Sequence, residues 1–127
     1  MKASGHIQDF LTFLDRCGEE YMAAAEQERS ADKETQDILH RLELHEDSYH
    51  DTARLAKAMR TVRRDRRAAK DTKTVTEPIV KWAGKNGHVI KGLERLLDEV
   101  QKAEEWAESR SYTERTGILD GVFGKGQ

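Results

Sequence analysis

The chain is poor in residues that make turns, strands and crosslinks. Its 127 residues include one proline, one cysteine and nine glycines, and aromatic residues make up 6%. This composition argues against a sandwich, a barrel or an alternating strand and helix fold, because each needs many turns and many strand-forming side chains. The single cysteine, Cys17, rules out an intramolecular disulfide and a cysteine-cluster zinc site.

Long apolar runs are also absent. No stretch approaches the roughly 18 apolar residues that span a bilayer, and the N-terminal MKASGHIQDF has no signal-peptide core. A net charge of -2 argues against a protein that coats nucleic acid through its overall charge, and equally against a strongly acidic DNA mimic. We therefore expect a cytoplasmic protein.

What the chain does contain is typical of helices. Apolar and charged residues each make up 36% of the sequence, and the mean hydropathy is -0.86. Each helix can bury only one stripe with such a composition. The length is that of one domain with one thin core.

The first predicted helix covers residues 7–44. Apolar or small side chains recur every three or four positions, which is a heptad pattern. Glu28 and Thr35 interrupt this stripe. Its apolar or small members are Ile7, Phe10, Leu14, Cys17, Tyr21, Ala24, Ala31, Ile38 and Leu42. Cys17 therefore falls in the buried stripe, where a small inert side chain is expected.

A tight reversal is predicted at HEDS, residues 45–48. Ser48 is suited to cap a new helix, and Asp51 in its first turn adds favourable charge. The second helix would cover residues 49–75, so the first two helices form a long antiparallel hairpin.

Pro78 predicts a further helix start, because it lacks an amide hydrogen and disfavours helical geometry at the residue before it. Thr76 is a candidate cap for this third helix, predicted over residues 78–108. Gly84 and Gly87 weaken its middle, yet the apolar stripe continues across them. The stripe consists of Val75, Ile79, Trp82, Asn86, Val89, Leu93, Leu96, Val100, Ala103 and Ala107.

Asn86 allows two interpretations. At a core position it would pair with its own copy in a parallel dimer and fix the register; alternatively, it lies in a capped or exposed local break. The regular stripe favours self-association, with a homodimer as the expected form. The candidate interface residues are Trp82, Asn86, Val89, Leu93, Leu96 and Val100.

Residues 1–110 therefore form a single predicted all-α domain, a coiled-coil-like bundle without a sheet. Residues 111–127 lose the helical periodicity and gain glycine, so they are predicted to be a C-terminal tail. The apolar residues of this tail are expected to dock on the protein or its oligomer. They are Ile118, Leu119, Val122 and Phe123.

The strongest anomaly is a basic run, with seven cations in the fourteen residues 60–73. Three explanations stay open: pairing with the acidic first helix, binding of nucleic acid or a nucleotide phosphate, and binding of an acidic protein. A reversal near Glu46 would place the run opposite the acids of residues 19–32. The candidate binding residues are Arg60, Arg63, Arg64, Arg67 and Lys70.

Catalytic and metal motifs do not stand out. His40, His45 and His50 crowd the predicted turn, but a spacing of five residues does not place them on one helix face. The sequence has no G-x-S-x-G turn and no phosphate-cradling glycine loop. We expect no enzyme activity, no catalytic residues, no metal and no cofactor.

One stretch resembles a group of small, uncharacterised helical proteins of phages and prophages of anaerobic Gram-positive bacteria. The shared features are the leucine-rich helix end at 39–44, Tyr49-His50, the arginine-rich 60–70 and Glu77-Pro78-Ile79. Many members have glycine in the turn, where this chain has His45-Glu46. The resemblance implies a phage context and a bacterial cytosol, and it transfers no functional residues.

Together these observations predict a phage-type interaction protein. Small non-enzymatic phage proteins commonly bind a host component, and anti-defence inhibitors such as anti-CRISPR proteins are one such class. The expected partner is a bacterial protein complex. The alternative is nucleic-acid or nucleotide-phosphate binding through the basic run of residues 60–73.

Overall fold

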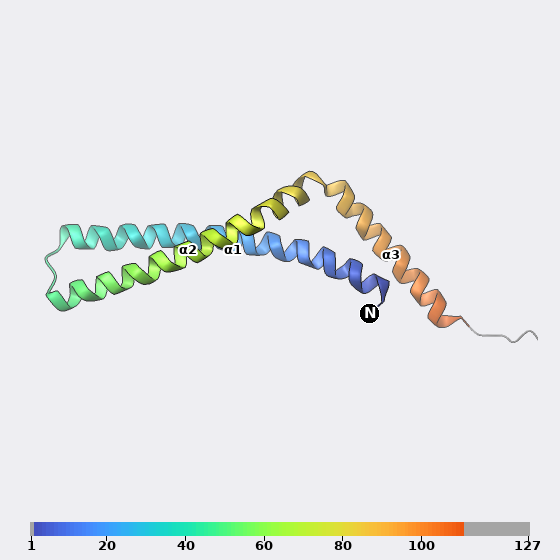
Figure 1. Cartoon of the computed structure of the whole chain (residues 1–127), viewed down its shortest axis with the longest axis horizontal. Coiled ribbons are helices and arrows are strands. Elements are labelled where there is room, and N and C mark those ends of the chain that lie inside the picture. The colour runs from blue at the N-terminus through green and yellow to red at the C-terminus, as the bar shows by residue number, and fades with distance from the viewer. Residues whose placement is uncertain (1, 111–127) are drawn as a thin grey trace, which may run out of the picture.

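The computed structural model describes residues 2–110, and all regular structure in this part is helical. Three helices follow in order: α1 (Ala3–Leu44), α2 (Tyr49–Lys85) and α3 (Gly87–Ser109). Figure 1 shows α1 and α2 as a long antiparallel hairpin and α3 turning back toward the N-terminus. The predicted all-α hairpin is confirmed. The predicted tail, with its docking residues, lies outside the described residues.

The seam between α1 and α2 follows the predicted heptads. Buried residues recur every seven positions, at Cys17, Ala24 and Ala31 in α1 and at Val62, Ala69 and Thr76 in α2. Five of these six side chains are no larger than threonine's, so the two helices approach closely over a narrow core. Leu11 of α1 is buried as well, whereas Phe10, a member of the predicted stripe, is exposed. Cys17 is buried as predicted, and the interface is a stripe rather than a broad layer.

The reversal between α1 and α2 is also confirmed. The Ser48 hydroxyl accepts a hydrogen bond from the Asp51 amide at 3.2 Å, which caps α2. Arg41, in the last turn of α1, holds Asp47 with two hydrogen bonds, 2.6 Å from Nη2 and 3.1 Å from Nε. This fork closes the hairpin end through side chains as well as through the backbone.

The predicted helix end at residue 75 is wrong, because α2 continues through Pro78 to Lys85. Proline removes one intrahelical hydrogen bond, a loss that packing of the same helix on α1 offsets. Thr76 is buried in that packing, and its hydroxyl donates to the Thr72 carbonyl at 2.8 Å. Thr76 therefore lies inside α2 and does not cap a third helix.

The predicted single helix over residues 78–108 is likewise wrong, because the chain breaks at Asn86. The Asn86 backbone has φ -119° and ψ 35°, and its side-chain amide donates to the Trp82 carbonyl at 2.8 Å. Two nearby glycines, Gly84 and Gly87, lower the helical preference of this segment. Of the two roles considered for Asn86, the structure shows the capped break.

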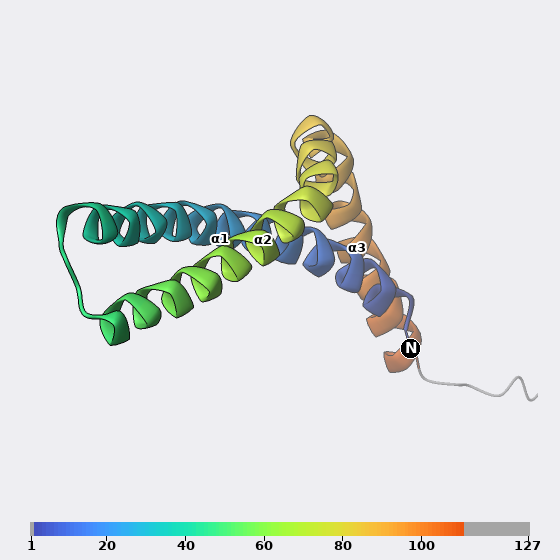
Figure 2. The same ribbon diagram turned by 60° about the vertical axis from the view of Figure 1, so that its left-hand side comes forward.

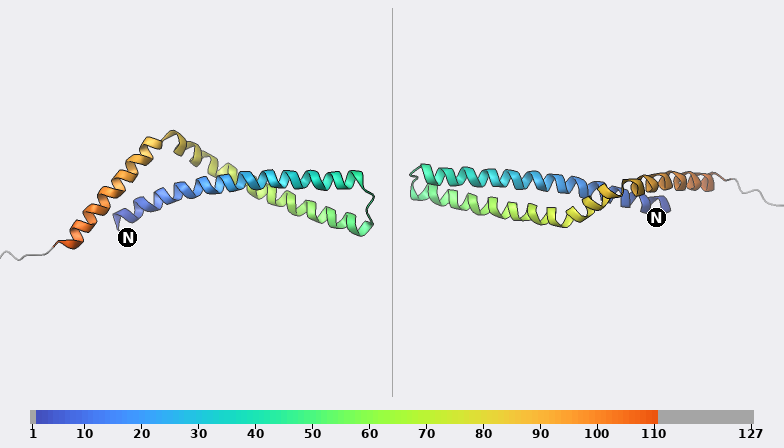
Figure 3. Two further views of the ribbon diagram at one scale, coloured as in Figure 1. Left: turned by 180° about the vertical axis from the view of Figure 1, so that it is seen from behind. Right: turned by 90° about the horizontal axis from the view of Figure 1, so that it is seen from above.

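The third helix closes a triangle with α1 and the end of α2 (Figure 2). Its last turn meets the start of α1, where Lys2 forms an ion pair with Glu108 and the Ser4 amide donates to Glu104 at 3.4 Å. No residue of α3 is buried. Seen from above, α3 and the start of α1 lie at one level, so this part of the molecule is a single helix layer (Figure 3).

Candidate functional site

The basic run divides into two sets of side chains, and the first set faces α1. Arg66 Nε lies 2.6 Å from Asp32 Oδ1, and its Nη2 lies 3.6 Å from Glu28 Oε1. Lys73 Nζ lies 3.3 Å from Glu28 Oε2, which is buried and has no hydrogen-bond partner. The predicted pairing of the basic run with α1 is therefore confirmed for Arg66 and Lys73.

The second set faces solvent and contains all five candidate binding residues. Each of them is exposed, and none of their side chains forms an ion pair with another residue of the range 2–110. They are Arg60, Arg63, Arg64, Arg67 and Lys70, called the basic face below. Pairing of these five with α1 was one of the predicted explanations, and it is wrong, because no ion pair within residues 2–110 joins any of them to that helix.

Helical geometry explains the division. Arg66 and Lys73 continue the spacing of three and four that joins Val62, Ala69 and Thr76, so they lie on the seam side of α2. The basic-face residues follow one another at intervals of three or one and lie outside this seam stripe, over about 15 Å of helix. This extension of the buried stripe through Arg66 and Lys73 is the sequence signal that distinguishes the two sets.

Charge is distributed unevenly among the helices. The sequence of α2 has eleven basic and four acidic residues, whereas α1 has ten acidic and four basic residues. The sequence of α3 has six acidic and three basic residues. The basic face is thus one positive stripe on a molecule whose other two helices are negative, and its field is local.

The predicted oligomer-interface residues are distributed over two helices. Trp82 belongs to α2, Asn86 is the break, and four residues belong to α3. Trp82, Val89 and Leu96 are 41%, 38% and 43% exposed, whereas Leu93 and Val100 are half-buried. Phe10, which the sequence pattern placed in the buried stripe of the first helix, is 43% exposed, and Phe13 beside it is 46% exposed. Both belong to this apolar surface.

An apolar groove lies between α1 and the end of α2. It has a volume of about 290 Å³, and its α1 side includes Phe10 and Phe13, whose ring centroids are 6.5 Å apart. Pro78, Ile79 and Trp82 form its α2 side. Both sides of the groove are apolar, and none of the side chains that line it is titratable.

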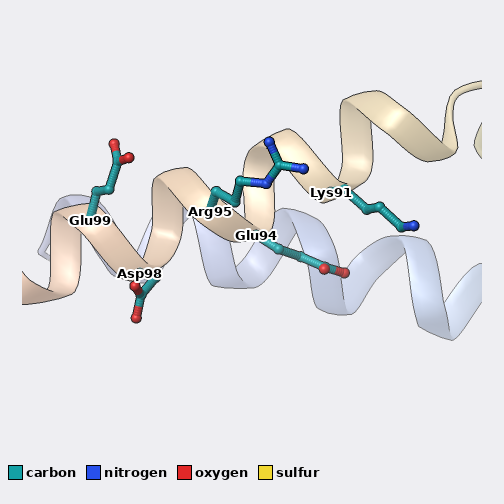
Figure 4. A pocket seen from close by; sticks show the side chains of 5 residues that line it. All are labelled: Lys91, Glu94, Arg95, Asp98 and Glu99. Carbon is teal, nitrogen blue, oxygen red and sulfur yellow. The ribbon is translucent and has the colours of Figure 1, made fainter.

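A second hollow, on α3, is entirely charged (Figure 4). It is lined by Lys91, Glu94, Arg95, Asp98 and Glu99. Figure 4 shows these side chains pointing in different directions rather than toward one point. Within residues 2–110 no three histidine, cysteine or acidic side chains are grouped to hold a metal ion, and none of the three helices is long and apolar enough to cross a membrane.

Three ion pairs shift pKa values, always toward the charged form. A hydrogen bond from Arg41 lowers the pKa of Asp47. Hydrogen bonds to Glu108 and Asp98 raise the pKa values of Lys2 and Lys102, respectively. All three shifts stabilise existing charges at neutral pH, which is the effect of structural ion pairs.

Comparison with protein families, with curated proteins and with solved structures finds no match for this chain.

Proposed function

We propose that this protein is a non-enzymatic interaction protein that binds an acidic surface of a bacterial protein complex through the basic face of α2. One observation carries the proposal: the five basic-face cations are exposed and unpaired within the described residues, although α1 offers ten acids. Within residues 2–110, Arg66 and Lys73 are the cations of the basic run that pair with that helix. The remaining positive charge is available to an external anion.

A folded protein fits this surface better than a nucleic acid. The basic face extends over about 15 Å, and the helices beside it carry an excess of acidic residues. A long polyanion would meet those negative helices, whereas an acidic patch of similar size would not. The four arginines also suit carboxylates, because a guanidinium donates two parallel hydrogen bonds to one carboxyl group.

The resemblance to phage proteins supplies the proposed context. A small phage protein without catalytic residues acts by occupying a surface of a host complex, in the cytosol of its bacterial host. Inhibition of a defence complex, as by anti-CRISPR proteins, is the form of this action that we propose. Acidic patches that normally receive basic subunits are the surfaces that the basic face would occupy.

Phosphate binding is the second candidate function, and it rests on the same exposed arginines. Arginine forks bind phosphate oxygens as they bind carboxylates. No aromatic residue lies within the run of residues 60–73, so a base-stacking platform is missing from that segment. This second candidate function would therefore consist of contacts with the phosphate backbone of a nucleic acid, and its affinity would fall steeply as the salt concentration rises.

The test replaces Arg63, Arg64 and Arg67 together with glutamine. Tagged protein is used to capture partners from host lysate, with and without nuclease, and the retained proteins are quantified by mass spectrometry. We expect at least about tenfold less partner on the variant, because three charge-assisted contacts are lost. The matched control replaces three exposed cations outside the basic face, Lys81, Lys85 and Lys91, with glutamine.

Both variants should melt within about 2 °C of the unchanged protein, because exposed and weakly paired cations contribute little to stability. Equal capture by the two variants contradicts the proposal. Loss of all partners after nuclease treatment contradicts it as well and favours phosphate binding.

A further inference from the structure

Exposed apolar side chains occupy corresponding positions on all three helices. Each directly precedes, in the sequence, a residue that is buried or half-buried and is therefore taken as the inner position of its helix turn. One residue step turns a helix by about 100°. Each exposed side chain therefore lies about 100° around the helix axis from its inner neighbour, in the same rotational sense on all three helices. The pairs are Phe10 and Leu11, Phe13 and Leu14, Trp82 and Ala83, Val89 and Ile90, and Leu96 and Leu97.

The direction of the helices then decides on which side of the layer these residues emerge. Both α2 and α3 run antiparallel to α1 (Figure 1). Two antiparallel helices in one layer are related by a twofold axis perpendicular to that layer. Rotation about this axis leaves each face of the layer on its own side. The exposed apolar residues therefore share one face, as the groove between Phe10, Phe13 and Trp82 shows directly for α1 and α2. We call Phe10, Phe13, Trp82, Val89 and Leu96 the open face.

The opposite side of the layer is polar. It carries the residues that directly follow the same inner positions in the sequence. These residues lie about 100° around the helix axis from the inner position, in the direction opposite to that of the open-face residues. Thr12 and Asp15 follow Leu11 and Leu14 in this manner, and all such residues are exposed. On the third helix they are Lys91, Asp98 and Gln101. The layer thus has one apolar face and one polar face.

The open face supplies most of the apolar area that a stable dimer needs. Its five side chains are 38% to 46% exposed, which corresponds to roughly 400 Å² of open surface per copy for side chains of this size. Two copies together would bury about 800 Å² from these residues. A standard interface buries about 1,600 Å² in total, of which roughly 65% is apolar in homodimers, so these five residues supply most of the required apolar area.

We infer that the open face is a homodimer interface, on which a second copy of this chain stacks face to face. A single helix layer cannot enclose the apolar residues along its inner edges, whereas two stacked layers can. A twofold axis brings the same face of both copies together and leaves both polar faces outside, so assembly ends at the dimer. The inference is independent of the proposed function, because the open face and the basic face share no residue.

The test is sedimentation equilibrium of the full chain between about 1 and 200 µM. Phe13→Glu and Leu96→Glu each place a carboxylate on the open face. The matched controls, Thr12→Glu and Gln101→Glu, place the same charge on the polar face of the same helices. We expect a dimer for the unchanged chain and both controls, and a dissociation constant raised at least about 100-fold for the open-face variants, because each dimer loses the contact twice.

Helix content from circular dichroism establishes that each variant has folded, and Phe13→Gln and Leu96→Gln replace any glutamate variant that has not. A full chain that stays monomeric up to about 200 µM overturns the inference. This holds whether the C-terminal residues of the same chain cover the open face or the face is left uncovered. Dimers that persist in the open-face variants, or that dissociate equally in the controls, also overturn it.

Discussion

Glu28 is an acid in a seam of small side chains, and its neighbours explain how it is accommodated. Its side chain is 19% exposed and lies within ion-pair distance of Arg66 and Lys73, one seam position to either side on α2. A partly buried charge needs such partners, since removal from water is costly. The three residues also define the register, because a slip of α2 along α1 would leave Glu28 without a cation.

Removing the charge of Glu28 should therefore destabilise the hairpin. We expect Glu28→Gln to lower the free energy of unfolding by about 1–2 kcal/mol, because two cations in the seam lose their partner. Urea denaturation followed by circular dichroism measures this change. Glu26→Gln is the matched control, since Glu26 is 72% exposed and its ion pair in the described part of the chain is with Arg29, in its own helix turn. Equal stability of the two variants would contradict the role assigned to Glu28.

Asp47 makes the hairpin end sensitive to acid. A hydrogen bond from Arg41 lowers the pKa of Asp47 below its ordinary value, which is about 3.9 in unfolded chains. A lowered pKa in the folded state adds stability that is complete above the ordinary value and is lost as the pH falls through the lowered value. The contribution is therefore present at pH 7 and disappears in strong acid.

Asp47→Asn should melt below the unchanged protein at pH 7, and the difference should shrink as the pH falls below about 4. Thermal melts from pH 7 to pH 2 measure it. The same substitution in an Arg41→Gln background should show no such pH dependence, because the partner is already gone. A difference that stays constant down to pH 2 would exclude the Arg41 contact as its source.

At the scale of the element, α1 contains a weak point that packing does not require. Gly18 lies inside this 42-residue helix, and a Cβ atom built there meets no atom within 4 Å. Its conformational freedom in the unfolded chain is thus a cost without a compensating close approach.

We expect Gly18→Ala to raise the free energy of unfolding by about 0.5–1 kcal/mol, and Ala23→Gly at an exposed position of the same helix to lower it by a similar amount. Chemical denaturation of the two variants provides the comparison. A loss of stability in Gly18→Ala would mean that α1 and α2 approach more closely at this glycine than the structure shows.

The end of α2 shows where sequence patterns are insufficient. Pro78 disfavours a helix locally, yet the helix continues because Thr76 is buried against α1 and the next turns pack with it. The stripe from Val75 to Ala107 is unbroken in the sequence, yet the chain breaks at Asn86. The periodicity of a sequence indicates which residues prefer burial. It stays the same whether those residues lie on one helix or on two helices of different direction, so it does not reveal the break.

At the scale of the whole molecule, the number of buried residues is small. Six apolar residues and one threonine are buried among residues 2–110, so the long helices depend on whatever else covers their apolar edges. If the open face is a dimer interface, association and folding are linked, and stability depends on protein concentration.

The melting temperature should then rise with concentration. Between about 5 and 500 µM we expect an increase on the order of 5 °C for the unchanged chain, and almost none for Phe13→Glu. Differential scanning calorimetry at several concentrations measures this dependence. A melting temperature independent of concentration would indicate that the monomer alone supports the fold.

The sequence by itself determined the helical composition, the hairpin, the capped turn at Ser48 and the buried stripe through Cys17. These features follow from spacing and capping within a few residues of one another. Only the tertiary structure decided that Arg66 and Lys73 enter the seam while the basic face turns outward, and that one face of the α1, α2 and α3 layer is apolar. Both results depend on how each helix is rotated and directed against its neighbours, which no local pattern specifies.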